Sequence, residues 1–598
     1  MDYSIYKDCN VRETVEKIKT ILDKTGIEIE EDILMQSIPS EFQPYSLRLN
    51  MFGDANKGTN GKGTTLENAK ASGYSEFMER LQNQANNIAI LNNEFFHYSP
   101  DEKVTSAEHM KKLAKYFGNY ETIFNYNKLC SRFLKSDNQA VYVPFYSVKD
   151  KKTVYIPIYA IRYSQGSNGM CAGNTPEEAL VQGMSEICER YAMKEIINKK
   201  IVLQDIPENV YSKYEKLLNL KKYIENCGWN VWIKDASLGG KLPVICSIFE
   251  NKEDKDFSVN FGAQPSLPVA IERTLTEFAQ GRNLVEKLDA ILPYNKSNLN
   301  RYMDLSYSYI LKCNPQFTHN EILDNIFFNK KNKNCKFKQQ AWIEEHKYYS
   351  NKEILKFLLK KMSKICKNEL YIRNNSFLGF PSYYIFIPKM SIVDKKDLKY
   401  TNKQLNFEKW ILYTKDLIPE HKKIDSLISA LDFKINNDNS FTSTTRNSFV
   451  CNLSHEYVIF LCYVIKNDIE NILKYANIIS EKNIVTDDNK KLIEIIIKYY
   501  SLKKENTKEI DIYENLNLLY PEEEINNFKL FIKNLSFERV KKIISNSNIK
   551  GQKENNKSAE EINKEKEIQQ KCLKVKNNLI EKYIKNTPSQ MELADIFK

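Results

Sequence analysis

Residues 173–190 read GNTPEEALVQGMSEICER, and residues 63–80 read GTTLENAKASGYSEFMER. The two stretches align without a gap at an offset of 110 residues, and nine of the eighteen aligned positions are identical. The identical positions include glycine, alanine and serine as well as glutamate, which two unrelated surface helices have no reason to share. The chain therefore contains an internal repeat, and the rest of the sequence is interpreted from it.

Each copy is typical of a loop followed by a helix. Thr65 and Thr175 suit the N-cap position, and Pro176 suits the first helical position of the second copy. Small residues recur along one side of each helix and would let it pack closely against another helix or a sheet: Ala69, Gly73, Ala179 and Gly183.

Residues 269–282, VAIERTLTEFAQGR, form a third and weaker copy. Glu277 follows Ala270 at the same distance at which Glu76 follows Ala69. Gln280 stands where the other copies have their second glutamate. Residues that are three positions apart on a helix lie on the same face. Each copy is therefore expected to present a pair of acidic or amide side chains: Glu76 and Glu79, Glu186 and Glu189, Glu277 and Gln280.

These pairs have two interpretations. In the first, the carboxylates face solvent and each pairs with the arginine beside it. In the second, the three helices converge, and the carboxylates can stay ionised only beside compensating positive charge. A hard cation such as Mg²⁺, with oxygen ligands and substrate phosphates, would supply that charge. The recurrence of the whole pattern favours the second interpretation, with Arg80, Arg190 and Arg282 as phosphate contacts.

The loops before the helices agree with a phosphate site. Residues 53–65, GDANKGTNGKGTT, offer glycines together with Lys57 and Lys62, although the spacing is not that of a Walker A motif. Backbone N–H groups at the start of a helix attract phosphate oxygens. The repeat therefore predicts a site for Mg²⁺ and a nucleotide.

Taken together, the three copies resemble the nucleotide-binding signature of the YcaO superfamily, which holds ATP and Mg²⁺ on glutamate-bearing helices without a Walker motif. The resemblance runs over about the first two-thirds of the chain and is closest in residues 167–197 and 261–282. It implies that Glu76, Glu79, Glu186 and Glu189 are the metal ligands. It also implies further nucleotide contacts, at Lys7, Lys62, Arg80, Asn174, Glu178, Arg190, Glu277, Gln280 and Arg282. No catalytic residue is assigned.

Within the family, the founding type is the most similar. This similarity implies an accessory role in RimO-dependent β-methylthiolation of an aspartate in small-subunit ribosomal protein S12, with a RimO-type methylthiotransferase and S12 as partners. Other members are enzymes that form thioamides or azolines. In these enzymes a nucleophile adds to a peptide amide carbonyl, and ATP phosphorylates the resulting oxyanion. A third hypothesis is a non-enzymatic scaffold that only binds nucleotide, so the resemblance leaves enzymatic activity open.

Some positions depart from the family pattern. Gln264, Cys171 and Lys389 replace the residue types expected there, which bears on the substrate rather than on the ATP site. The chain ends in PSQMELADIFK, without the proline-rich tail common in azoline-forming members, and this makes azoline formation less expected.

The overall sequence predicts two domains. Hydrophobic residues make up 42% of the 598 residues and charged residues 28%, which excludes global disorder. We expect an α/β (α+β) YcaO-type core of mixed sheets and helices over residues 1–396, followed by an all-α domain over residues 397–598. Stacked helix pairs of the tetratricopeptide (TPR) kind are one arrangement open to this domain, although no strict repeat is present.

The composition also limits the classes of binding partner and the cellular location that we expect. The net charge of +11 comes mainly from lysines interleaved with glutamate and asparagine, which is typical of solvated helix faces, and no nucleic-acid motif is present. No apolar stretch approaches the roughly 20 residues of a membrane span. We therefore expect a cytoplasmic protein that does not bind membranes, and a homodimer formed through the helical tail.

Overall fold

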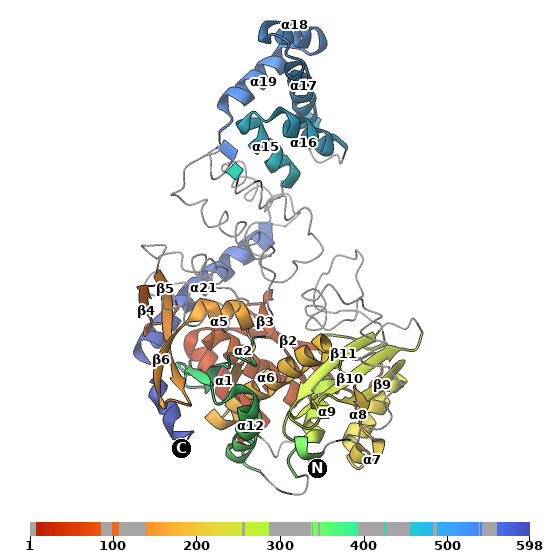
Figure 1. Ribbon diagram of the computed structural model, residues 1–598, viewed down its shortest axis with the longest axis vertical. Coiled ribbons are helices and arrows are strands. Elements are labelled where there is room, and N and C mark those ends of the chain that lie inside the picture. Colours follow the sequence, from red (N-terminus) through yellow and green to blue (C-terminus); the bar gives the residue numbers. More distant parts are fainter. Residues whose placement is uncertain are drawn as a thin grey trace. The chain divides into compact units, whose positions relative to one another are not determined.

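The structure, a computed structural model, describes residues 7–84, 98–106, 139–253, 257–285, 339–344, 349–392, 455–481, 487–536 and 559–597, and isolated positions between them. The chain divides into two compact units. The first comprises Met1–Lys396 and Ile568–Lys598, and the second comprises Asp397–Glu567 (Figure 1). This division differs from the expected one over Ile568–Lys598, which lies with the first unit rather than with the helical region.

The first sheet of the first unit contains three antiparallel strands, β1 (Ile29–Leu34), β2 (Tyr45–Met51) and β3 (Asp54–Gly63), in that order. Three helices share an apolar cluster with it: α1 (Val11–Thr25), α2 (Leu66–Gln82) and α21 (Ala559–Lys585). Helix α1 has the limits that the sequence predicts, because Gly26 adopts a left-handed φ of 82° and ends it. From α21 the side chains of Val575, Leu579, Ile580 and Tyr583 are buried in this cluster, which explains why the C-terminal segment belongs here.

The second sheet has six strands, all in antiparallel pairs, in the order β4-β5-β12-β13-β7 with β6 also paired to β5. Their bounds are β4 Lys103–Ser106, β5 Gln139–Ser147, β6 Lys152–Pro157, β7 Met170–Ala172, β12 Tyr371–Asn374 and β13 Ser382–Phe386. The helical elements of this region are α5 (Ile158–Gln165), α6 (Pro176–Asn198), α12 (Asn351–Cys366) and the short η5 (Gln590–Asp595). The apolar run VYIPIYAI, which predicts one strand, divides at Pro157 into β6 and α5.

The third sheet follows the order β11-β10-β9-β8 and is also antiparallel. Its strands are β8 (Gln204–Asp205), β9 (Trp229–Asp235), β10 (Val244–Asn251) and β11 (Phe257–Ala263). The helical elements near it in the chain are α7 (Glu208–Tyr211), α8 (Glu215–Asn226), α9 (Leu267–Phe278) and η4 (Gln339–Ala341).

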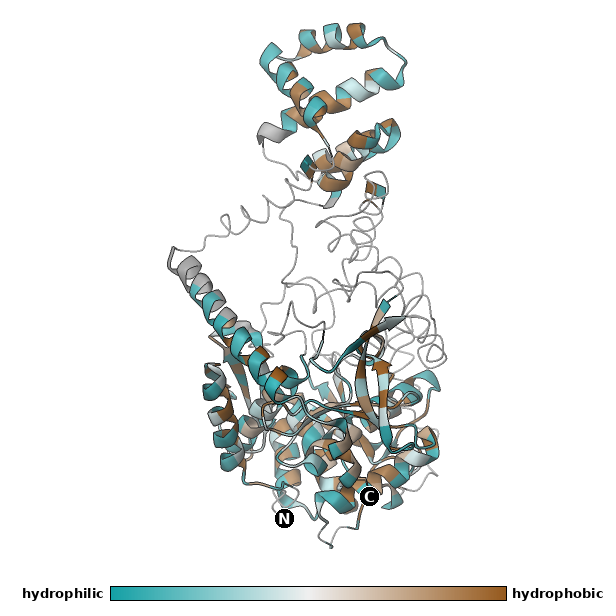
Figure 2. Cartoon of the chain, turned by 90° about the vertical axis from the view of Figure 1, so that its left-hand side faces the viewer, coloured by the Kyte–Doolittle hydropathy of each residue, from teal (hydrophilic) through white to brown (hydrophobic). Residues whose placement is uncertain are grey.

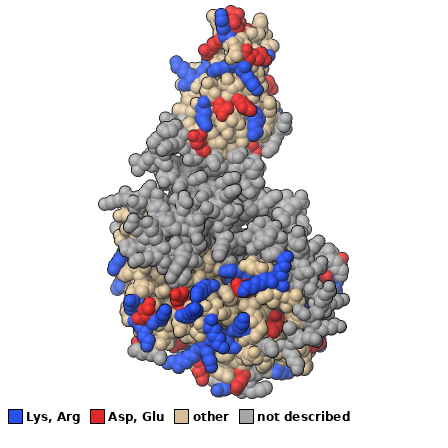
Figure 3. Space-filling model, in the orientation of Figure 1, with Lys and Arg blue, Asp and Glu red and all other residues tan. Residues whose placement is uncertain are grey.

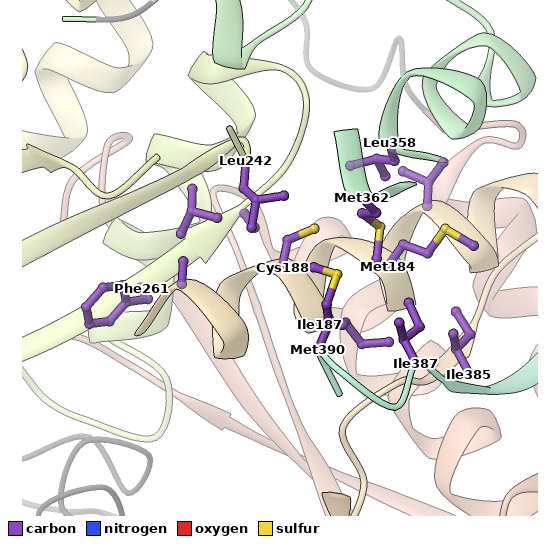
Figure 4. Close-up of a cluster of buried hydrophobic side chains, with 14 of the residues drawn as sticks. Met184, Ile187, Cys188, Leu242, Phe261, Leu358, Met362, Ile385, Ile387 and Met390 are labelled. Carbon is purple, nitrogen blue, oxygen red and sulfur yellow. The ribbon is translucent and has the colours of Figure 1, made fainter. Parts of the chain in front are cut away.

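Helix α6 connects the second and third sheets through one apolar core. Figure 4 shows Met184, Ile187 and Cys188 of α6 between side chains of both regions. These partners are Leu242, Phe261, Leu358, Met362, Ile385, Ile387 and Met390. Because this side of α6 is buried, the acidic residues of the same helix are held in a fixed orientation.

The second unit has its own apolar core and is helical throughout its described residues. It contains α15 (His455–Lys466), α16 (Ile469–Glu481), α17 (Asp487–Lys504), α18 (Glu509–Leu519) and α19 (Glu522–Asn534). Apolar and polar stretches alternate along these helices (Figure 2). The run from 456 to 480 is two helices rather than one, since Asn467 takes a positive φ of 54° between them. The structure does not confirm a TPR arrangement.

The described helices are all too short or too polar to cross a membrane. On the face of the first unit seen in Figure 3, basic side chains alternate with acidic and neutral surface.

Candidate functional site

The first two copies of the repeat start in the same way. The hydroxyl of Thr65 accepts a hydrogen bond from the backbone N–H of Asn68 at 3.1 Å, and that of Thr175 accepts one from Glu178 at 3.2 Å. Both threonines are the N-caps of their helices, and Pro176 follows the second cap. The predicted starts of α2 and α6 are therefore confirmed.

Glycines at or just after the ends of strands explain why small residues recur on the helices. A Cβ atom on Gly63 would lie 2.7 Å from the backbone nitrogen of Ala69, and one on Gly173 would lie 2.7 Å from that of Ala179. Such distances are too short for any side chain. Each helix therefore packs directly against the backbone that leads into it, as the small residues predict.

The third copy has the same close packing of a glycine against the helix backbone, but its helix ends earlier. A Cβ atom on Gly61 would approach the carbonyl oxygen of Ala69, and one on Gly262 would lie 3.0 Å from that of Ala270. Helix α9, however, ends at Phe278, so Gln280 lies in a turn in which its N–H donates to the carbonyl of Glu277 at 3.1 Å. Gln280 therefore stands just beyond the end of the helix, although its side chain and that of Glu277 both reach Lys62.

On α2, Arg80 neutralises both glutamates of its copy. Its guanidinium lies 3.4 Å from a carboxylate oxygen of Glu76 and 3.4 Å from one of Glu79. Burial raises the pKa of Glu79 well above its usual value; Arg80 opposes this increase, while Glu186 and Glu76 add to it. Because Glu186 belongs to α6, the acidic residues of the first two copies lie within electrostatic reach of one another.

On α6, Glu189 is also largely buried. Burial raises its pKa to about 7, and the charge of Glu186 adds to the increase, although Arg190 opposes it. The guanidinium nitrogen Nε of Arg190 lies 3.7 Å from the Glu189 carboxylate. The simple surface interpretation thus holds only in part, since arginines pair with Glu79 and Glu189 but both carboxylates are largely buried.

Lys62 of β3 brings the three copies together. Its ammonium group contacts the carboxylate of Glu277 and lies 3.4 Å from Oε1 of Gln280. Burial lowers the pKa of Lys62 to about 8, whereas the carboxylates of Glu76 and Glu189 oppose the decrease. The ammonium group of Lys62 therefore interacts electrostatically with acidic side chains of α2, α6 and α9.

Other contacts fix the third copy on the first. The Nε2 amide of Gln280 donates to the carbonyl of Asn60 on β3 at 3.2 Å. Arg282 stacks its guanidinium over the ring of Phe278, 5.7 Å from the ring centroid. Its backbone carbonyl accepts a hydrogen bond from Gln36.

Lys7, Asn174 and Glu178 form a cluster of their own at the start of α6. Lys7 Nζ lies 3.2 Å from Glu178, Asn174 donates to the same carboxylate at 3.2 Å, and the backbone N–H of Asp8 donates to it at 3.0 Å. Among the described residues, no hydrogen bond or ion pair joins this cluster to Glu186 or Glu189. These three predicted nucleotide contacts thus do contact one another, but they form a group separate from the carboxylates of Glu186 and Glu189.

Two basic residues near the carboxylates are absent from the sequence prediction. Arg273 donates to Oε1 of Gln182 on α6 at 2.6 Å and affects the pKa of both Lys62 and Glu189. Arg48 of β2 donates to Asn60 at 3.1 Å, and Glu76 affects its pKa. Arg273 stands one helical turn before Glu277, a spacing that could have identified it.

The three departures from the family pattern lie in different surroundings. Cys171 is fully buried, and burial together with the charges of Glu79 and Glu186 raises its pKa well above the usual value. Gln264 is buried and accepts a hydrogen bond from the N–H of Ser266, the N-cap of α9. Lys389 is exposed.

The residues fit a divalent cation by their chemistry. Among the described residues, no three His, Cys, Asp or Glu side chains already stand at metal-binding distances. Burial raises the pKa of both Glu79 and Glu189, and the charge of Glu186 adds to the increase in each, although Arg80 opposes it at Glu79 and Arg190 and Lys62 oppose it at Glu189. The buried hydroxyl of Ser185, beside Glu186, also has no hydrogen-bond partner there. Buried carboxylate charge of this kind is what a Mg²⁺ ion would relieve.

Comparisons with known proteins identify the family of the chain. The family model described as YcaO cyclodehydratase, ATP- and Mg²⁺-binding, matches residues 60–391. The chain is 33% identical over 302 residues to the ribosomal protein S12 methylthiotransferase accessory factor YcaO of Escherichia coli, covering 48% of this chain and 51% of that protein. It is 33% identical over 324 residues to an uncharacterised protein of Haemophilus influenzae, covering 51% and 54%. The chain thus spans about half the length of the curated relatives that it matches.

Two solved structures are also similar. A heterocyclase in complex with substrate and cofactor matches with a TM-score of 0.46 and 16% identity, over 65% of this chain and 54% of the other. YcaO from Methanopyrus kandleri, bound with AMPPCP and Mg²⁺, matches with a TM-score of 0.41 and 15% identity, over 66% and 95%. The family model covers more than half of the chain and includes all three helices of the repeat. The chain therefore belongs to the YcaO family, whose cofactors are ATP and Mg²⁺.

Proposed function

We propose that the carboxylate cluster of α2 and α6 is the Mg²⁺–ATP site of this chain. The ligands of the metal would be Glu76, Glu79, Glu186 and Glu189, with Arg80, Arg190, Lys62 and Gln280 toward the phosphates. The observation that carries the proposal is the position of Lys62, which contacts Glu277 of the third copy while it lies in the field of Glu76 and Glu189 of the other two.

The side chains of the cluster have complementary tasks. The carboxylates provide the negative charge that holds a cation, and the guanidinium of Arg80 pairs with two of them and opposes the effect of burial on the pKa of Glu79. Lys62 and Arg190 are positioned to balance phosphate charge. When bound, Mg²⁺–ATP supplies a γ-phosphoryl group that can be transferred to an amide oxyanion.

The biological role we propose is that of an accessory factor in β-methylthiolation of the aspartate of ribosomal protein S12. The support is the 33% identity to the E. coli protein of that name. Its partners would then be a RimO-type methylthiotransferase and S12 itself. A homodimer formed through the helical region remains part of this proposal.

A second function is ATP-dependent activation of peptide amides, leading to a thioamide or an azoline in a modified peptide. It is favoured by the description of the family model as a cyclodehydratase. The two functions differ in the polypeptide that is modified and in the atom that reacts, which is the β-carbon of an aspartate in the first and a peptide amide in the second.

The nucleotide site is tested by titration calorimetry with Mg²⁺–ATP on the full chain. We expect the Glu189→Gln variant to bind at least about tenfold more weakly, a loss of about 1.4 kcal/mol. Glu195→Gln is the matched control, because Glu195 lies on the same helix but pairs with Lys199. Equal affinity for the wild type and Glu189→Gln would refute the metal assignment.

The biological role is tested by mass spectrometry of S12 from cells that lack this chain. We expect the methylthio mass on the aspartate to fall, and to return when the wild-type chain is supplied but not when Glu189→Gln is supplied. Unchanged methylthiolation in the deletion strain would leave the peptide-modifying function in its place.

A further inference from the structure

The first unit exposes a group of apolar side chains beside strand β1. They are Ile33, Met35, Ile38, Phe42 and Val285, and we call them the β1 surface. Met35 is 60% exposed, and each of the others is at least 36% exposed. A single exposed apolar residue needs no explanation, but five in two adjoining segments mark an interaction surface.

Strand β1 is also an edge of its sheet. Among the described strands it pairs only with β2, whereas β2 pairs on both sides. An exposed edge offers backbone N–H and C=O groups to another extended segment. The β1 surface therefore combines apolar side chains with an available row of backbone hydrogen-bonding groups.

The charge of the strand favours a basic partner. Glu30 and Asp32 are exposed. Asp32 accepts a hydrogen bond from the side-chain amide of Asn50, and among the described residues neither carboxylate forms an ion pair. Glu28 and Glu31, by contrast, pair with lysines of the same unit, Lys571 at 2.9 Å and Lys70 at 2.7 Å. Glu30 and Asp32 thus carry negative charge along an edge whose other acidic residues are already paired with lysines.

Hydrogen bonds connect this surface to the candidate ATP site. Gln36 donates to the carbonyl of Arg282 at 2.8 Å and accepts from the N–H of Leu284 at 3.0 Å, while Asn283 donates to Ser37 at 2.8 Å. Gly281, next to Gln280, donates to Ser46 of β2 at 2.8 Å. A chain bound along β1 would therefore lie beside the loop that carries Gln280.

We propose that β1 and the β1 surface bind an extended polypeptide segment with alternating apolar and basic side chains, and that this segment is part of the substrate. The inference rests on the proposed function, because modification of a polypeptide, whether S12 or another peptide, requires a docking place for that polypeptide. Backbone pairing along β1 would supply affinity, and Glu30 and Asp32 would select basic side chains.

The test measures peptide binding by fluorescence anisotropy without nucleotide, on the full chain. The probe is a fluorescein-labelled decapeptide of lysine, valine and threonine, in which lysine and valine alternate over the central residues. We expect saturable binding that weakens at least about fivefold in Met35→Asp and in Glu30→Lys. Ile584→Asp and Glu253→Lys, at exposed positions of the same unit outside the surface, are the matched controls and should bind as the wild type does.

A second probe, N-methylated at alternate residues, tests backbone pairing and should bind at least about fivefold more weakly than the first. Equal binding of both probes, or equal binding by the wild type and Met35→Asp, would overturn the proposal. So would a dimer that Met35→Asp converts to a monomer, since a second copy would then cover the surface. Because Met35→Asp should retain wild-type affinity for Mg²⁺–ATP, failure of peptide docking is distinguishable from failure of the nucleotide site.

Discussion

The ammonium group of Lys62 on β3 contacts the carboxylate of Glu277 near the end of α9. This contact joins the first copy of the repeat to the third, and it lies beside the acidic residues of the second. A surface lysine gains little from an ion pair, but this one is largely removed from water and surrounded by several carboxylates. Its position, within electrostatic reach of acidic residues from three helices, is the basis of the nucleotide site that we propose.

Replacing Lys62 by methionine keeps the length of the side chain and removes its charge. We expect the affinity for Mg²⁺–ATP in calorimetry to fall at least about tenfold, since phosphate charge then loses a partner. Lys57→Met is the control, because Lys57 pairs with Asp54 and not with the cluster. Unchanged affinity in Lys62→Met would mean that Lys62 is only a structural ion-pair partner.

The same variant has an expected effect on stability without ligand. The folded state lowers the pKa of Lys62 from 10.5 to about 8, so folding disfavours its ammonium form. This penalty is complete below about pH 8 and disappears as the pH rises toward 10.5. We therefore expect Lys62→Met to melt at a higher temperature than the wild type at pH 7, with a smaller difference at pH 10. A difference that grows with pH would contradict the lowered pKa.

Glu189 should make Mg²⁺–ATP binding depend on pH. Because its pKa is raised to about 7, the carboxylate is mostly protonated at pH 6 and mostly ionised at pH 8. Only the ionised form binds a cation well, so affinity should increase by about tenfold over this range. The phosphates of ATP also titrate in this pH range. The pH dependence of the wild type is therefore compared with that of Glu189→Gln. We expect calorimetry to show a weaker pH dependence in the variant, and an equal dependence would exclude this role for Glu189.

The glycine contacts of the repeat give a prediction about stability. A Cβ on Gly173 would lie 2.7 Å from the backbone of Ala179, and neither backbone segment can move without displacing α6. Gly239→Ala is the control: its Cβ would meet no atom within 4 Å, but its φ of +73° is unfavourable for alanine. We expect Gly173→Ala to lower the melting temperature more than Gly239→Ala does. The opposite order would mean that backbone conformation matters more at these sites than close packing.

Local features of the site could be predicted from the sequence. The N-caps Thr65 and Thr175 and the small residues of the repeat depend on contacts within a few residues or on one close neighbour. The pairing of Lys62 with Glu277 could not be predicted in the same way, because it depends on how distant segments pack. The sequence indicates which residues are unusual, and the tertiary structure decides which of them meet.

The position of the C-terminal segment shows the same limit. Val575, Leu579 and Tyr583 recur at helical spacing, which predicts one buried face but not the surface that covers it. The neighbouring helices in the sequence suggest a common helical domain. In the structure this face is buried against α1 and the first sheet, so the segment completes a core that begins at the N-terminus.

We therefore expect residues 568–598 to matter more for the stability of the first unit than residues 397–567 do. Arg373 of β12 is fully buried and contacts both Asp101, at 2.8 Å, and the hydroxyl of Tyr583, at 3.3 Å. Gln590 donates to the carbonyl of Asn374 at 3.2 Å and accepts from its N–H at 2.6 Å, which closes a pair of hydrogen bonds on the end of β12.

Deleting residues 568–598 should therefore expose apolar surface of the first unit, leave the backbone N–H and C=O of Asn374 without Gln590, and remove the Tyr583 hydroxyl from Arg373, which keeps Asp101. Each such loss costs on the order of 1–3 kcal/mol, so we expect a chain that is insoluble or melts at least about 10 °C lower. Replacing residues 397–567 by a flexible glycine–serine linker is the matched control and should leave a folded first unit that binds Mg²⁺–ATP in calorimetry. If the truncated chain were as stable as this linker variant, the C-terminal segment would be an appendage, and the core would have to end before it.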